Sequence, residues 1–376
     1  MASKISGKMA EVSMGKALWL LEHKIKNNLL TPTMFLGASG IGKTAMLSGL
    51  AEKLGYELVD LRLAEYSAVD LKGVPDIDRE TKTTQWFKDE ILPRDNANED
   101  RKVLLVLDEI TSIEDRNVQT VVYQLLNERR LGLDYSLPKN CHIVGLGNRP
   151  QDGGNYASLL APLRNRMAIY EINFDFEVWS SWAAKTGLNV NVLSFLTQNK
   201  DRIFSYDDDS EGTEENMVFA TVRSWTNAAY MLDTLDITDE DSLYSALTGM
   251  IPAPITSEFL THLTIVANLP SVEDIATGKK SYTDVKETYK DSAGFILAQP
   301  LGKFCFDKFK NAEEKEFITV MKNTVNFLLE YDVMPATMFI KYLQQAGTTQ
   351  EFAKVATIMA KNEDLKKITR AIDSFK

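Results

Sequence analysis

The chain has 376 residues, a net formal charge of −11 and a sequence pI of about 5.0. A chain of this length is expected to form two or three domains, because a single hydrophobic core stops growing beyond about 250–300 residues. Its composition, 44% hydrophobic and 25% charged, is typical of a globular protein. The acidic balance argues against a general nucleic-acid binder, since phosphate contacts come from clustered Lys and Arg.

The cysteines and histidines indicate neither a disulfide framework nor a zinc site. Cys141 and Cys305 stand beside apolar or aromatic residues and are expected to be buried and reduced, and the histidines are far apart in the sequence. The N-terminal segment has no apolar core and no cleavage site, and no stretch has the length of an apolar transmembrane helix. We therefore expect a cytoplasmic chain that contacts no membrane.

The first half of the chain alternates between helical and extended patterns. Helical spacing of apolar residues predicts helices over 12–26 and 43–54, with a short strand at 33–36 between them. The further elements expected are a strand at 56–63, a β-hairpin within 74–87, a strand at 102–107, a helix at 116–130, a hairpin at 131–138, a strand at 141–147, a short helix at 158–166 and a strand at 168–172. Such alternation indicates an α/β fold, a parallel sheet with helices on both faces.

After about residue 173 the extended pattern fades. The segments VWSSWAAKTG, VRSWTNAAYMLDTL and FITVMKNTVNFLLEY are helical in composition, so the second half is predicted to be all-α. The acidic run at 207–215 is interpreted as a solvated loop.

Residues 37–44 read GASGIGKT and fit the phosphate-binding pattern G-x-x-x-x-G-K-[ST]. The glycines allow backbone N–H groups to turn inward around phosphates, Lys43 offers a charge to the β- and γ-phosphates, and the Thr44 hydroxyl would ligate Mg²⁺. A strand before the loop and a helix after it argue against a chance glycine-rich turn. With the carboxylate described next, the predicted nucleotide-binding residues are Gly37, Ala38, Ser39, Gly40, Ile41, Gly42, Lys43, Thr44 and Asp108.

A second motif, VLLVLDEI at 103–110, ends a buried strand with two carboxylates. Ligands of open α/β sheets bind at the carboxyl ends of strands, where Asp108 would hold Mg²⁺ with Thr44 and Glu109 would act as the base for an attacking water. Alone, an acidic pair could end a strand by chance. Beside the phosphate loop, it predicts hydrolysis of Mg²⁺·ATP.

These two motifs together resemble those of the AAA+ superfamily, and within it the chain looks like the MoxR branch. DLKGVPDID and QWFKDEILP resemble the hairpin that this branch inserts in its second helix. LLNERRLGLDYSLPKN resembles its later hairpin, GLGNRP its sensor-1 strand end, and ATVRSW its sensor-2 helix. Over about residues 10–270, the resemblance implies a P-loop sheet with strand order 5-1-4-3-2. It implies an ATPase core at 1–173 and a helical lid at 174–275, and leaves 276–376 as a helical extension with no assigned role.

The resemblance also carries catalytic roles over by position. It makes Asn148 the sensor-1 residue that orients the attacking water, and Arg223 the sensor-2 residue; an ordinary strand-end turn and a surface salt bridge are the alternatives. It places an arginine finger in PLRNRM, where Met167 replaces the usual Phe and two arginines are present. Either Arg164 or Arg166 could act, and Arg166 is favoured.

For function, the resemblance implies an ATPase ring, expected to be a hexamer, that remodels or activates a protein partner. That partner could carry a von Willebrand factor A domain, as partners of MoxR-like proteins often do. A nucleic-acid motor or loader similar to McrB could use the same core, although the acidic balance argues against it; a slow nucleotide-controlled scaffold is disfavoured by the intact carboxylate pair. Trp86 and Phe87, on the first hairpin, either pack against the ATPase domain or contact a partner.

Overall fold

The computed structural model describes residues 9–80, 83–87, 91–94, 100–131, 135–149, 161–205, 217–236 and 239–367. The chain divides into two compact units, Met1–Asp175 and Phe176–Lys376, whereas the sequence placed the end of the core at residue 173. The subdivision of the second half at residue 275 stays a prediction. In the described ranges, no helix has the length and apolar character needed to cross a bilayer.

The first unit is built on a parallel sheet whose described strands follow the order β1-β10-β2-β9-β6-β3. These strands are β1 (Ala10–Ser13), β2 (Thr33–Leu36), β3 (Glu57–Arg62), β6 (Lys102–Asp108), β9 (Asn140–Gly147) and β10 (Ala168–Asn173). Apart from the edge strand β1, the order is the predicted 5-1-4-3-2. The predicted P-loop sheet is therefore confirmed.

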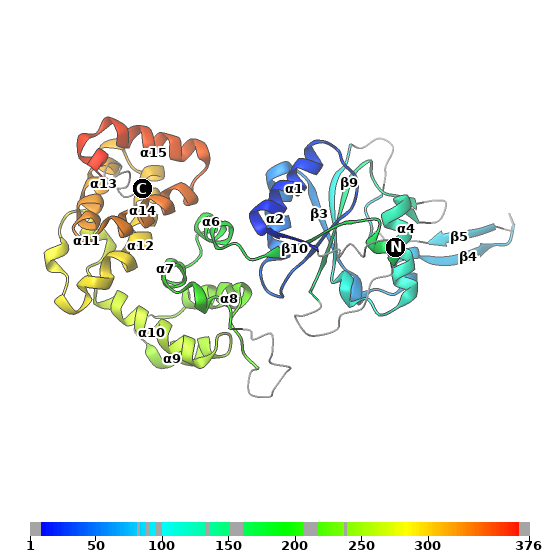
Figure 1. Ribbon diagram of the computed structural model, residues 1–376, viewed down its shortest axis with the longest axis horizontal. Helices are drawn as coiled ribbons and strands as arrows, with labels where there is room; N and C mark the ends of the chain where they lie inside the picture. The colour runs from blue at the N-terminus through cyan, green and yellow to red at the C-terminus, as the bar shows by residue number, and fades with distance from the viewer. Residues whose placement is uncertain are drawn as a thin grey trace, which may run out of the picture. The chain divides into compact units, whose positions relative to one another are not determined.

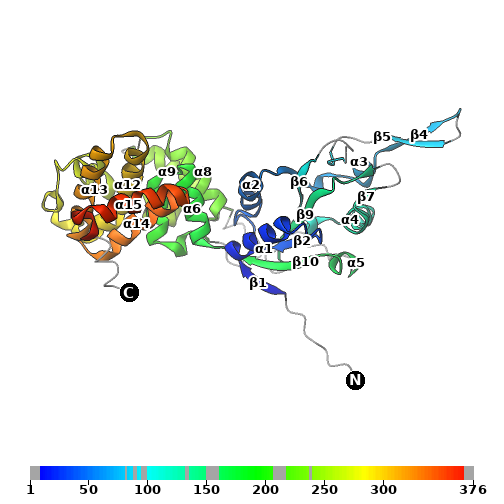
Figure 2. The ribbon, with the colours of Figure 1, turned by 90° about the horizontal axis from the view of Figure 1, so that it is seen from above.

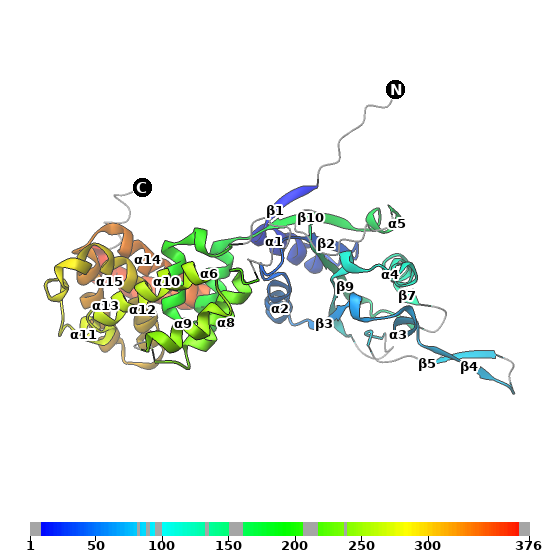
Figure 3. The ribbon, with the colours of Figure 1, turned by 90° about the horizontal axis from the view of Figure 1, so that it is seen from below.

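Helices cover both faces of this sheet. They are α1 (Met14–Lys26), α2 (Lys43–Leu54), α3 (Ala68–Lys72), α4 (Arg116–Glu128) and α5 (Ala161–Arg164). The helices α1 and α2 lie on one side of the strands, and α4 and α5 lie on the other (Figures 1 and 3). Because both faces are covered, β6 is fully buried from Val103 to Leu107, which explains its uninterrupted aliphatic sequence.

Two antiparallel hairpins interrupt the alternation, as predicted. One pairs β4 (Val74–Asp78) with β5 (Thr83–Phe87), and the other pairs β7 (Arg130–Leu131) with β8 (Tyr135–Ser136). The β4–β5 hairpin extends away from the rest of the first unit (Figures 1 and 2).

The N-terminal boundary differs from the prediction. Val12 and Ser13, which were expected in a helix over 12–26, belong to β1, which pairs in parallel with β10. The helix begins at Met14 because the Ser13 hydroxyl accepts the N–H of Lys16 at 3.2 Å as an N-cap. Of the predicted helix over 158–166, α5 covers Ala161–Arg164; residues 158–160 and the acidic run at 207–215 lie outside the described residues.

Both cysteines are buried and unpaired, as predicted. Burial raises the pKa of Cys141 to about 11 and that of Cys305 to about 12. At neutral pH both thiols are therefore protonated, and the thiolate is the reactive form.

The second unit is helical throughout its described residues, as predicted. Its α-helices are α6 (Phe176–Thr186), α7 (Val190–Gln198), α8 (Val222–Leu232), α9 (Glu240–Thr248), α10 (Ala253–Asn268), α11 (Val272–Ala276), α12 (Lys290–Asn311), α13 (Glu314–Leu329), α14 (Val333–Ala346) and α15 (Thr349–Lys361). The long helix α12 packs against α7, α11, α13 and α14 (Figure 3). It therefore connects helices on both sides of residue 275.

Two glycines in α12 lie directly against aromatic rings. A Cβ atom at Gly294 would lie 2.7 Å from Cγ of Tyr331, and one at Gly302 would lie 2.8 Å from Cδ1 of Tyr342. Both rings thus pack directly on the helix backbone. This contact explains two glycines in the interior of a helix, where glycine is otherwise unfavourable.

We expect Gly294→Ala to lower the free energy of unfolding by about 1–3 kcal/mol, because the added methyl group would overlap the Cβ and Cγ atoms of Tyr331. The control is Gly49→Ala in α2, where a Cβ meets nothing within 4 Å. There the better helix propensity of alanine should raise stability by about 0.5–1 kcal/mol. Chemical denaturation measures both variants, and equal effects would contradict the packing argument.

Candidate active site

The loop of residues 37–42 connects β2 to α2 and has the backbone of a phosphate-binding turn. Gly40 and Gly42 have φ values of 73° and 91°, a left-handed conformation that glycine adopts without strain. Gly42 is also the N-cap of α2 and has no side chain to cap it, so the first-turn N–H groups can bind an anion. A Cβ at Gly37 would lie 2.8 Å from Ile41 and 2.9 Å from Ile172, so the loop begins tightly packed.

Lys43 lies over this loop and reaches the end of β9. Its Nζ donates hydrogen bonds to the carbonyl oxygens of Gly37 at 2.7 Å and Ala38 at 3.0 Å. It also donates to Oδ1 of Asn148 at 3.2 Å. The structure therefore brings the predicted phosphate-binding lysine and the predicted sensor-1 amide together, although 105 positions separate them in the sequence.

Thr44 and Asp108, the two predicted Mg²⁺ ligands, are also in contact with each other. The Thr44 hydroxyl donates to Oδ2 of Asp108 at 3.1 Å, and Oδ1 of Asp108 accepts the N–H of Glu109 at 2.8 Å. Glu109 has a φ of 56°, which is uncommon outside glycine, and its side chain is exposed. This conformation turns the chain from β6 into the 3₁₀ turn Ile110–Ser112.

Asp60 adds a carboxylate that the sequence analysis did not identify. It stands on β3, where Arg62 pairs with Asp108 in the sheet register, so Asp60 shares a sheet face with Asp108. Desolvation raises the pKa of Asp60, and the charge of Asp108 raises it further, while Arg62 lowers it. The sequence did contain a signal for this residue. Asp60 lies in the strand predicted at 56–63, which the implied strand order places beside the strand that ends in Asp108 and Glu109.

The donor set fits a magnesium nucleotide. A hydroxyl and a carboxylate oxygen 3.1 Å apart, from Thr44 and Asp108, are hard ligands of the kind that Mg²⁺ prefers. The neighbouring carboxylate of Asp60 makes this end of the sheet more favourable for a cation, and the Lys43 ammonium can face phosphate oxygens.

The two arginine-finger candidates lie at the surface of the first unit. Arg164 is the last residue of α5, Arg166 follows two positions later, and both side chains are exposed. Met167, which replaces the usual Phe, is buried in the hydrophobic core of the first unit. Either arginine is accessible to a second molecule, and the choice between them stays a prediction.

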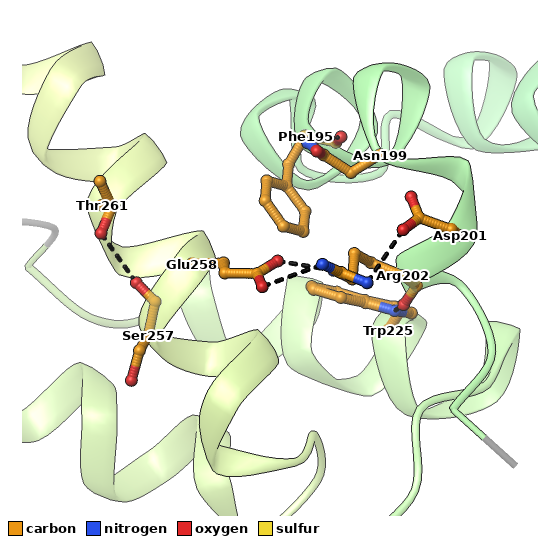
Figure 4. Close-up of polar contacts among 8 residues, drawn as sticks. All are labelled: Phe195, Asn199, Asp201, Arg202, Trp225, Ser257, Glu258 and Thr261. Carbon is orange, nitrogen blue, oxygen red and sulfur yellow. Dashed lines mark hydrogen bonds and ion pairs between the residues drawn. The ribbon is translucent and has the colours of Figure 1, made fainter.

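Arg223 belongs to the second unit, where it is exposed in the first turn of α8. This turn is well anchored within that unit. Buried Trp225 donates its Nε1–H to the carbonyl of Arg202 at 2.9 Å, and Nε of Arg202 donates to Glu258 of α10 at 2.6 Å (Figure 4). The sensor-2 role of Arg223 stays a prediction.

A comparison with known protein families agrees with the strand order of the sheet. Residues 32–167 match the family model described as AAA domain (dynein-related subfamily). This match spans both nucleotide motifs and Asn148. Together with the strand order, it identifies the fold of the first unit as the P-loop AAA+ α/β fold, and membership of the MoxR branch stays a prediction.

Whole-chain comparisons add little. One similar structure is that of a protein from Cytophaga hutchinsonii to which ATPase activity has been ascribed, with TM-score 0.35, 10% identity, and coverage of 96% of this chain and 90% of that one. Another is C. elegans PCH-2, with TM-score 0.32, 14% identity and coverage of 68% of each chain. Both scores are too low to support an inference, and no curated protein matches the sequence significantly.

Lys43→Ala should abolish measurable binding of Mg²⁺·ATP, a loss on the order of 10²-fold or more, because the phosphates lose a charge held inside the loop. Lys53→Ala on the same helix is the matched control, since Lys53 forms a surface ion pair with Glu22 at 2.8 Å. Isothermal calorimetry with both variants tests the site. Unchanged affinity in Lys43→Ala would refute it.

Proposed function

We propose that this chain is a Mg²⁺·ATP-dependent AAA+ ATPase. The observation that carries the proposal is the hydrogen bond between Thr44 and Asp108 at 3.1 Å, formed beside the contact of Lys43 with Asn148 at 3.2 Å. These contacts support the proposal because Lys43, Thr44 and Asp108 lie close together at one edge of the sheet, next to the exposed side chain of Glu109.

Each side chain then has a defined task in hydrolysis. The loop N–H groups and Lys43 bind the phosphates, while Thr44 and Asp108 hold Mg²⁺, which when bound would neutralise charge on the β- and γ-phosphates. The Glu109 carboxylate accepts the proton of the attacking water, and the Asn148 amide orients that water. The Glu109 side chain is exposed and therefore accessible to water.

Glu109→Gln should bind Mg²⁺·ATP with nearly normal affinity and hydrolyse it about 10²- to 10⁴-fold more slowly, because the amide cannot accept the proton. Glu114→Gln, an exposed substitution in the segment before α4, is the control and should leave kcat unchanged. Phosphate release and nucleotide binding are measured on the same samples. A near-normal kcat in Glu109→Gln would mean that another group activates the water.

We extend the proposal to a ring, a hexamer in keeping with the resemblance to the MoxR branch. Phosphoryl transfer spreads negative charge over the equatorial oxygens of the γ-phosphate. A cation supplied by a neighbouring subunit would stabilise that charge in the transition state. Arg164 and Arg166 support this arrangement because both are exposed at the end of α5. Arg166 is the proposed finger, and Arg223 the proposed sensor in the second unit.

Arg166→Ala should bind ATP normally and lose about 10³- to 10⁵-fold in kcat if it is the finger. Mixing it with Lys43→Ala subunits should restore part of the activity, because a mixed interface joins an intact phosphate loop to an intact finger. If subunits demonstrably exchange and no activity returns, Arg166 does not act across an interface. The same mixture with Arg164→Ala then tests the other arginine.

The protein-partner role is supported by the β4–β5 hairpin. Ile77 and Trp86 face the same side of the hairpin and are 70% and 43% exposed. Exposed apolar side chains on a projecting hairpin fit a protein surface better than a nucleic acid, and neither strand contains Lys or Arg. We therefore propose a remodeller or activator of a protein partner, with a von Willebrand factor A domain as the first candidate. Stimulation of ATPase activity by DNA at moderate salt would instead support a motor or loader similar to McrB.

A further inference from the structure

Thr111 joins the turn that follows Glu109 to the end of the strand that precedes Asn148. Its hydroxyl accepts the backbone N–H of Asn148 at 3.0 Å, across 37 positions of sequence. We propose that Thr111 is a positioning residue for ATP hydrolysis, which sets the place of the Asn148 amide relative to Glu109. The inference rests on the proposed function, and it assigns a task to a residue that neither nucleotide motif uses.

The Thr111 side chain is buried and packs tightly on the end of β9. The residue is 1% exposed. A Cβ on Gly147 would lie 2.7 Å from its Cγ2 and 2.8 Å from its Oγ1. Both branches of the threonine therefore pack directly on the backbone of Gly147, which must be glycine for this contact to form.

The end of β9 also contacts the phosphate loop. The carbonyl of Gly147 accepts the N–H of Gly37 at 3.2 Å, and Oδ1 of Asn148 accepts Nζ of Lys43 at 3.2 Å. Gly147 and Asn148 thus touch the phosphate loop on one side and Thr111 on the other. These contacts connect the phosphate loop to the turn after Glu109 through Gly147 and Asn148.

The turn that contains Thr111 is short and closed by a hydrogen bond. The N–H of Ser112 donates to the carbonyl of Glu109 at 2.8 Å, and Ile110 between them is fully buried. Glu109 itself has a φ of 56°, a conformation that persists where the surrounding structure imposes it. Only two peptide units therefore separate Thr111 from the proposed catalytic residue Glu109.

The alternative is a purely structural role, in which Thr111 satisfies a buried N–H and affects stability alone. Two substitutions separate the roles. Thr111→Val keeps the shape and removes the hydroxyl, whereas Thr111→Ser keeps the hydroxyl and removes the methyl group. A structural role predicts that both variants hydrolyse ATP at the wild-type rate when folded.

The test measures kcat, KM and the Kd for Mg²⁺·ATP in the full chain. The Lys43→Ala variant serves as the inactive control and gives the rate without a functional site. Thr111→Val should lower kcat by about 10- to 100-fold with Kd nearly unchanged, since misplacement by about 1 Å can cost on the order of 10²-fold. Thr111→Ser should keep most of the rate. In an Asn148→Ala background, Thr111→Val should cause no further loss, because residues that act through one another are not additive.

Each outcome decides one point. A wild-type rate equal to that of Lys43→Ala refutes the ATPase proposal itself. An active wild type with an equally active Thr111→Val refutes the positioning role of Thr111. A Thr111→Val loss that is equally large in the Asn148→Ala background refutes action through Asn148. If Thr111→Val does not fold, Thr111→Ala, which removes the hydroxyl without adding bulk beside Gly147, is judged by the same criteria.

Discussion

The candidate site depends on the register of three parallel strands. In that register Leu36 of β2 lies beside Gly147 of β9, and Leu107 of β6 lies beside Gly145. The strands therefore end within one residue of one another, and the segments that follow them begin at the same edge. Hydrogen bonds between positions 64 and 105 apart in the sequence, Thr44 to Asp108 and Lys43 to Asn148, are consequences of this alignment. A shift of one strand by one residue would also turn each of its side chains to the opposite face of the sheet.

The sequence predicts the parts of the site that depend on local chemistry. Glycines with positive φ, a lysine and a threonine at fixed spacing form a turn whose geometry is largely internal, and the buried strand before Asp108 has an unmistakable aliphatic pattern. The strand order came from family resemblance and not from the residues themselves. The placement of Asn148 followed from the same resemblance, and the structure puts its amide next to Lys43.

What the sequence could not predict depends on contacts between distant segments. β1 has the sequence AEVS, which has no strong periodicity, and it is a strand because its backbone pairs with β10. Asp60 and Thr111 are ordinary residues until the sheet register and the Gly147 contact give them neighbours. Arg164 and Arg166 are both exposed, and their proposed contact is with another molecule, so the choice between them stays a prediction.

The burial of both thiols has a practical consequence for the study of this chain. The sequence contains two cysteines, and both side chains are enclosed with their pKa values raised well above neutral. Maleimide reagents, which require an accessible thiolate, should therefore leave the folded natural chain almost unmodified. A cysteine introduced at an exposed position, such as that of Ile77 on the projecting hairpin, becomes the preferred attachment point for a fluorophore or spin label. The sequence can thus serve directly as the background for distance measurements between introduced cysteines.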